Sequence, residues 1–172
     1  MLHPILRKLA GGDRRSIGRA NEVVAEILAR PSRLRILVEG LTNEDPLISM
    51  RAADALEKVT VQRPDLLRPH KNAILEISGR TRQQEVRWHM AALFPRLNLR
   101  AKERAVAVNI LFEYLGDKSS IVKTFAMQGL AGLSEQDPRL KASVIPLLKE
   151  LTQTGTPAMR ARGRKLLAGL AK

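Results

Sequence analysis

The chain has 172 residues, of which 30 are Lys or Arg and 17 are Asp or Glu, giving a formal net charge of +13 and an isoelectric point near 11. Cysteine is absent, which excludes a disulfide framework and thiolate metal sites, and no apolar run is long enough to cross a bilayer. We therefore expect a soluble cytoplasmic protein with one domain over 1–172 and a monomer as the default state. Its charge favours an anionic partner.

The N-terminal region is irregular. Its first segment, MLHPILRKLAGGDRR, contains a short apolar stretch that Pro4, Arg7 and Lys8 interrupt, and it lacks the long apolar centre of a secretory signal. We expect a frayed first helix that ends at the glycine pair. Two further helices are predicted over 14–30, capped by Asp13, and over 32–42, opened by Pro31. Residues 1–30 are expected to cover the N-terminal end of the array that follows.

A repeat of 37 residues runs through the rest of the chain. The leucine column of this repeat consists of Leu56, Leu93, Leu130 and Leu167. Two adjacent apolar columns consist of Ile36, Ala73, Ile110 and Leu147 and of Leu37, Ile74, Leu111 and Leu148. One further column consists of Glu39, Glu76, Glu113 and Glu150, an alignment that chance would seldom produce with 17 acidic residues. The chain is thus interpreted as an array of repeated units.

Each unit is predicted to contain two helices, because apolar residues recur at helical spacing and breaks fall between the segments. The first helices are expected over 46–60, 83–97, 120–133 and 157–171, and the second helices over 66–78, 101–115 and 139–152. Asp45, Ser119 and Thr156 are N-cap residue types. Gly79 and Gly116 are expected to end second helices in a left-handed conformation. No strand-like alternation occurs, so the fold class is all-α.

The segment DPLISMRAADAL resembles the signature of HEAT repeats, in which an Asp-Pro turn leads into a helix with an Arg and closely packed alanines. Asp45 and Arg51 are six residues apart, as in that signature. The spacing recurs at Asp117 with Lys123, while Thr81 with Arg87 and Thr154 with Arg160 keep the base and replace the acid. The resemblance implies an α-solenoid of about four helix pairs over 31–172, with these residues forming a ladder between neighbouring units.

Basic residues lie at the start of the second helix of each unit. They are Arg33, Arg35, Arg68, Lys71, Lys102, Arg104, Arg139 and Lys141. Cations at helix N-termini oppose the helix macrodipole, so a surface needed only for solubility would more often place acids there. The HEAT resemblance implies that second helices line a concave face, and these residues would then form a basic stripe for an acidic protein segment or nucleic acid. A merely solvated face is the competing interpretation, and Glu39 can pair with Arg35 within one helix.

Catalytic constellations are mostly missing, which favours a non-enzymatic binding or scaffold module without a cofactor. The three histidines, His3, His70 and His89, lie far apart in the sequence, so no metal site is predicted. No glycine-rich loop follows a strand, which disfavours nucleotide hydrolysis.

One enzyme class stays as an alternative. The alkylpurine DNA glycosylases built from HEAT-like repeats are similar in fold and charge, and that family uses a carboxylate beside aromatic residues. Trp88, between Arg87 and His89, is the candidate stacking residue of this chain. Its competing interpretation is packing between repeat units.

Overall fold

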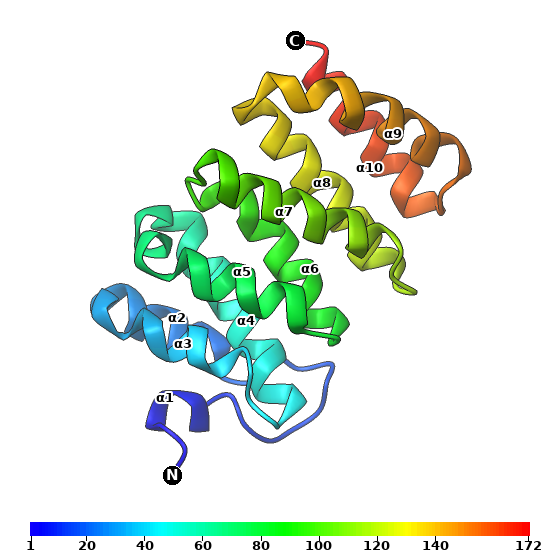
Figure 1. Cartoon of the computed structure of the whole chain (residues 1–172). Helices are drawn as coiled ribbons and strands as arrows, with labels where there is room; N and C mark the ends of the chain where they lie inside the picture. Colours follow the sequence, from blue (N-terminus) through cyan, green and yellow to red (C-terminus); the bar gives the residue numbers. More distant parts are fainter. The chain divides into compact units, whose positions relative to one another are not determined.

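The computed structural model describes residues 1–172 and is entirely helical, with ten α-helices, four short 3-10 segments and no strand. The all-α prediction is confirmed. The chain divides into two compact units, Met1–Met90 and Ala91–Lys172, whose helices are labelled in Figure 1. No helix combines the length and the apolar character that a membrane span requires.

The first unit is built around α4. Its elements are α1 (Pro4–Arg7), α2 (Ala20–Ala29), η1 (Pro31–Arg33), α3 (Leu34–Gly40), α4 (Pro46–Gln62), η2 (Pro64–His70), α5 (Lys71–Arg80) and the start of α6 (Gln84–Leu93). Helices α2 and α3 both pack against α4, and η2 contacts α4, α5 and α3. The buried side of α4 includes Ala52, Ala55 and Leu56, so small residues allow its neighbours to approach closely.

The second unit is built around α8. Its elements are the end of α6, η3 (Phe94–Arg96), α7 (Ala101–Leu115), α8 (Ser120–Gln136), η4 (Pro138–Leu140), α9 (Lys141–Thr154) and α10 (Pro157–Leu170). Helix α8 contacts α7, α9 and α10, and α9 also packs along α10. The predicted helix pairs are therefore present in each unit, while their arrangement as one continuous solenoid stays a prediction.

The predicted N-caps are confirmed at three helices. The Asp45 carboxylate accepts a hydrogen bond from the Leu47 amide at 2.9 Å. The hydroxyls of Ser119 and Thr156 accept from the third residue of α8 and of α10. Each cap satisfies one backbone donor that the first turn of a helix leaves without a partner.

The predicted leucine column lies in the core. Leu56, Leu93 and Leu130 are fully buried, whereas Leu167 on the last helix is half-buried. The neighbouring column of Leu37, Ile74, Leu111 and Leu148 is buried throughout. Ala73 is the exposed member of the remaining apolar column. The repeat thus identifies most core positions correctly, and Ala73, Leu147 and Leu167 are its less buried members.

Several predicted helix boundaries are wrong. The helix expected over 14–30 begins only at Ala20, because Gly18 has a φ of 54° and Asp13 bonds the amide of Arg15 in a local turn. The second helices expected from 66 and 139 begin at Lys71 and Lys141, after 3-10 segments that contain prolines. A proline lacks the amide that an α-helical hydrogen bond needs.

The predicted left-handed helix ends are also wrong. Gly79 lies inside α5, and Gly116 has a φ of −85°. The amide of Gly116 instead bonds the carbonyl of Glu113 in a tightened last turn. The only glycines with positive φ are Gly11, Gly12 and Gly18, all in the loop before α2.

That loop is held by Arg51, one of the largest fully buried side chains. Its guanidinium donates to the backbone carbonyls of Leu9, Gly11, Asp13 and Ser16 at 2.6–3.0 Å. A Cβ at Gly18 would lie only 3.0 Å from the guanidinium, so glycine is needed there for this close approach. The ladder expected from Asp45 and Arg51 does not form, because Asp45 caps its own helix and Arg51 binds loop carbonyls. The two residues therefore stabilise the first unit separately.

Related arginines also donate to turn carbonyls. Arg87 donates through Nε to the carbonyl of Thr81, and Arg160 donates through Nε to the carbonyl of Gly155. These bonds explain why an acid is not required six residues before either base. The main chain of the preceding turn supplies the acceptor.

Candidate anion-binding surface

The four predicted stripe residues of the first unit lie at two adjacent helix openings, because α3 contacts η2. Arg33 ends η1 and pairs with Glu26 of α2, and Arg35 pairs with Glu39 on its own helix at 3.1 Å. Lys71 begins α5, is half-buried and has a partner. Only Arg68, exposed in η2, has no ion pair among these four. Most of this group is therefore already neutralised.

The carboxylate of Glu26 holds Arg33, one of these cations, in place. This carboxylate receives hydrogen bonds from Lys8 at 2.8 Å and from Arg33. The bond from Lys8, followed by that from Arg33, keeps the pKa of Glu26 below its usual value despite the opposing effect of burial. Arg33 thus links η1 to α2, and its charge is neutralised by this acid.

In the second unit, Arg104 and Arg139 converge on one carboxylate. Asp137 lies between α8 and η4 and accepts from Arg104 Nη1 at 3.0 Å and from Arg139 Nη2 at 2.8 Å. These bonds, chiefly those from Arg139, hold the pKa of Asp137 far below its usual value. Asp137 also accepts a bond from the amide of Arg139, so it caps the 3-10 turn that carries this arginine. One acid thereby fixes two guanidinium groups side by side.

The two arginines differ in exposure. The Arg104 side chain is 18% exposed and also donates to the carbonyl of Leu99 at 3.0 Å. Its Nε is buried without a hydrogen-bond partner. The Arg139 side chain is 82% exposed. Arg139 is therefore the member of this pair that an approaching anion can reach.

A hollow of about 420 Å³ lies beside this Arg-Asp-Arg cluster. One side belongs to α7 and the other to the start of η4. Its lining consists of Ala101, Arg104, Ala105, Val108, Asn109, Asp137, Arg139 and Leu140. Two of the four predicted stripe residues of the second unit, Arg104 and Arg139, thus line a recess with a largely aliphatic floor.

Three predicted stripe residues, Arg68, Lys102 and Lys141, have no ion pair. Lys102 is exposed in the first turn of α7, and Lys141 is half-buried at the first residue of α9. Sequence reasoning missed the neutralisation of the others because the acids that pair with Arg33 and Arg104 come from other elements, 7 and 33 residues away. Only the pair within α3 had a sequence signal, the four-residue spacing of Arg35 and Glu39.

The glutamate column is exposed at all four positions. Glu39 pairs with Arg35, and Glu76 pairs with Arg80 at 2.9 Å, both within one helix. The column therefore contributes surface charge, and in the first unit part of that charge is neutralised by arginines one turn away.

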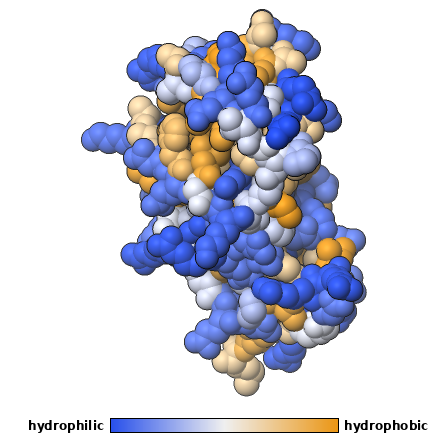
Figure 2. All heavy atoms as spheres, turned by 90° about the vertical axis from the view of Figure 1, so that its right-hand side faces the viewer, coloured by the Kyte–Doolittle hydropathy of each residue, from blue (hydrophilic) through white to orange (hydrophobic).

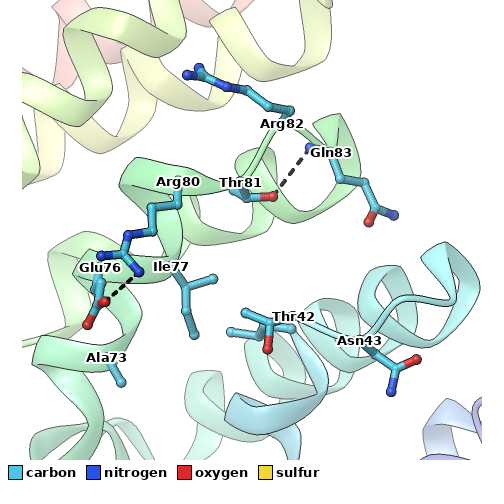
Figure 3. Close-up of a pocket in the computed structure, with 10 residues that line it drawn as sticks. Thr42, Asn43, Ala73, Glu76, Ile77, Arg80, Thr81, Arg82 and Gln83 are labelled. Carbon is cyan, nitrogen blue, oxygen red and sulfur yellow. Dashed lines mark hydrogen bonds and ion pairs between the residues drawn. The ribbon is translucent and has the colours of Figure 1, made fainter.

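The first unit contains a larger hollow, of about 570 Å³, that the sequence did not predict. It lies between the end of α3 and α5, and its lining consists of Leu41, Thr42, Asn43, Ala73, Glu76, Ile77, Arg80, Thr81, Arg82 and Gln83. Figure 3 shows Thr42 and Ile77 facing each other across it, with the Glu76-Arg80 pair on one side and Arg82 directed away. Of the two arginines in its lining, Arg80 is therefore neutralised by Glu76, and Arg82 is directed away from the hollow.

Trp88, the candidate stacking residue, is half-buried on α6. It borders a hollow of about 280 Å³ whose lining includes Arg14, Arg15, Asp54 and His89. The indole ring tilts by 50° against the ring of His89 at a centroid distance of 5.6 Å. Trp88 is thus partly accessible, with three arginines (Arg14, Arg15 and Arg51) and a carboxylate in the same recess.

Figure 2 shows a mostly hydrophilic face that apolar atoms interrupt in patches. Among large side chains of the second unit, Val106, Phe112 and Ile121 are exposed. The first unit contains 16 basic and 11 acidic residues, and the second contains 14 and 6. The excess of positive charge is therefore larger in the second unit.

The chain matches no protein-family model, and no curated protein matches it.

Proposed function

We propose that this chain is a HEAT-like α-solenoid protein that binds an anionic partner without catalysing a reaction. In this proposal, residues 31–172 form about four helix pairs, and residues 1–30 cover the N-terminal end. The partner is an acidic protein segment or a nucleic acid, and it contacts the cations that open the second helices. The fully buried leucines of the 37-residue repeat and the capped first helices support the repeat assignment.

The observation that carries the binding proposal is the set of cations without ion pairs at helix openings. Lys102 and Lys141 begin helices of 15 and 14 residues, so their charges oppose the helix dipole. Each such placement costs a few tenths of a kcal/mol or more, which a bound anion offsets. Backbone amides in the first turn of α7 supply further donors for an anion, whereas the amide of Lys141 at the start of α9 already bonds the carbonyl of Pro138.

The experiment compares two triple variants by fluorescence anisotropy near physiological salt, using labelled duplex DNA, single-stranded RNA and an acidic peptide. One variant reverses Arg68, Lys102 and Lys141 to Glu. The other reverses Arg164, Lys165 and Lys172, which are exposed cations on or beside the last helix and also have no ion pairs. Both variants change the net charge equally, so their difference isolates position from bulk charge.

We expect the helix-opening variant to lose affinity far more than the last-helix variant, because surface charges are screened over about 8 Å at physiological salt. Equal losses would show that the ligand responds only to net charge. A larger loss from the last-helix variant would move the site to α10. The slope of log affinity against log salt then separates nucleic acid, which gives a steep slope, from a peptide with few contacts.

A second candidate function, DNA glycosylase activity, rests on the hollow around Trp88. This recess brings the Asp54 carboxylate near an indole, as the resemblance to HEAT-like glycosylases implies. Asp54 is also ion-paired with Lys58 at 2.7 Å, which favours a structural role for it. Release of free base from alkylated duplex DNA, abolished by Trp88→Ala, would support this candidate. No release by the wild-type protein would remove it.

A further inference from the structure

We infer that the hollow beside the Arg-Asp-Arg cluster of the second unit binds an acidic peptide that carries an aliphatic side chain. This inference rests on the proposed function and narrows its partner to protein. The aliphatic side chain enters the recess between α7 and η4, and a neighbouring carboxylate binds Arg139 at its edge.

The floor of the hollow provides the first reason. Ala101, Ala105, Val108 and Leu140 line it with aliphatic carbon, and Val108 and Leu140 are half-buried. Burying a Leu-sized side chain removes apolar surface from water, so such a recess favours an apolar anchor. A phosphodiester backbone has no comparable group. Bases need aromatic platforms for stacking, and none lines this hollow.

The rim provides the second reason. Arg139 uses Nε and Nη2 to hold Asp137, but a guanidinium has five N–H donors, so donors are left on this 82% exposed side chain. A carboxylate reaching them forms a charge-assisted hydrogen bond. Lys102 lies in the first turn of α7 and Lys141 is the first residue of α9, and neither has an ion pair. The edge is therefore complementary to several acidic residues.

Asp137 provides the third reason, because it holds the arginines at the edge of the hollow in fixed positions. It holds Arg104 and Arg139 together and caps the turn that carries Arg139. Its lowered pKa keeps it ionised at neutral pH. The incoming carboxylate thus meets a guanidinium whose position is already fixed, which reduces the entropy lost on binding.

The larger hollow of the first unit lacks these properties. Its arginine wall consists of Arg80, already paired with Glu76, and Arg82, which points away from the hollow in Figure 3. Thr42, Asn43, Thr81 and Gln83 add polar groups to its lining. The second-unit hollow is therefore the better match for an acidic peptide with an aliphatic anchor.

The experiment measures anisotropy of two labelled peptides built from Glu, Ser and Gly, identical except for one central Leu or Ala. The protein is tested as wild type, as Ala105→Leu, which fills the recess, and as Ala168→Leu. Ala168 is an exposed alanine on α10 and serves as the matched control. Duplex DNA is titrated in parallel.

We expect the Leu peptide to bind wild type about tenfold more tightly than the Ala peptide, following the free energy of burying one aliphatic side chain. Ala105→Leu should remove that advantage, and Ala168→Leu should keep it. Equal binding of the two peptides to wild type would overturn the inference while leaving a charge-based site intact. Tight DNA binding with no peptide binding would also overturn it, and binding of no anionic probe would remove the proposed function as well.

Discussion

The two units use the base of the six-residue HEAT-like spacing in different ways. Arg51 in the first unit is fully buried and donates to four loop carbonyls, whereas Arg160 in the second unit is exposed and has one bond, to the carbonyl of Gly155. The difference arises because residues 9–18 cover α4, while no comparable loop covers α10 in its own unit. An arginine at the same spacing after a turn therefore binds different groups in the two units, because the surroundings of its side chain differ.

The units also differ in how their helix openings are neutralised. In the first unit, Arg33 and Arg35 are each paired with a glutamate, and one of these glutamates comes from a neighbouring helix. In the second unit, two arginines share the single carboxylate of Asp137, and Lys102 and Lys141 are left without ion pairs. The cations without ion pairs at helix openings therefore lie mainly in the second unit.

The strongest test of the comparison is truncation of the two corresponding arginines. Arg51→Ala should cost about 4 kcal/mol of unfolding free energy, because four loop carbonyls lose the charged donor of a fully buried side chain. Arg160→Ala should cost no more than about 0.5 kcal/mol, as expected for an exposed side chain. Denaturant unfolding measures both values. Similar losses would mean that Arg51 is not the residue that holds the loop.

The leucine column gives the next largest effects. Leu93→Ala and Leu130→Ala should each cost about 3 kcal/mol, since both side chains are fully buried. Leu167→Ala should cost clearly less because that leucine is half-buried. Thermal melts provide the measurement. A loss below about 0.5 kcal/mol at both buried positions would mean that the repeat does not mark the core.

Smaller changes of stability, in opposite directions, are expected when two glycines of α10 are replaced by alanine. Gly163 faces α9 so closely that an added Cβ would overlap the Thr152 hydroxyl and approach Met127, whereas a Cβ at Gly169 meets nothing within 4 Å. Gly163→Ala should destabilise by about 1–3 kcal/mol through overpacking. Gly169→Ala should stabilise by about 0.5–1 kcal/mol, because Gly is a poor helix former. If both substitutions stabilise in a denaturant titration, α9 and α10 do not pack as described.

The smallest effect concerns His70 at the end of η2. Burial lowers its pKa, and Glu39 only partly opposes this. The unfolded chain therefore binds the proton more readily, so stability should fall as pH drops through the ordinary histidine pKa of about 6.5. His70→Gln should flatten this part of the profile of unfolding free energy against pH. An unchanged profile would show that His70 makes no contribution there.

Residue type and spacing in the sequence correctly predicted the helix caps and the buried leucines of this fold. Asp45, Ser119 and Thr156 cap helices as their residue types indicate, and the leucines at 37-residue spacing are buried. Gly116 did not adopt its predicted conformation, because the tightened turn at that helix end does not require a positive φ.

Long-range contacts explain what the sequence could not predict. Arg51 finds its acceptors 35 to 42 residues away in a loop whose path depends on three glycines with positive φ. The Arg104-Asp137 pair joins elements 33 residues apart. The sequence placed Arg104 and Arg139 correctly at helix openings, but it contained no signal for the carboxylate that they share.

The central claim is that the position of the cations at the helix openings, rather than net charge, creates the binding site. Asp137→Asn tests it directly, because the substitution raises the net charge by one while removing the carboxylate that holds Arg104 and Arg139. Asn is as good a capping residue as Asp, so the η4 turn should persist, and a thermal melt verifies this. We predict that anisotropy will show weaker binding of the acidic Leu peptide to Asp137→Asn than to wild type. Tighter binding of that peptide to the more positive variant would contradict the account.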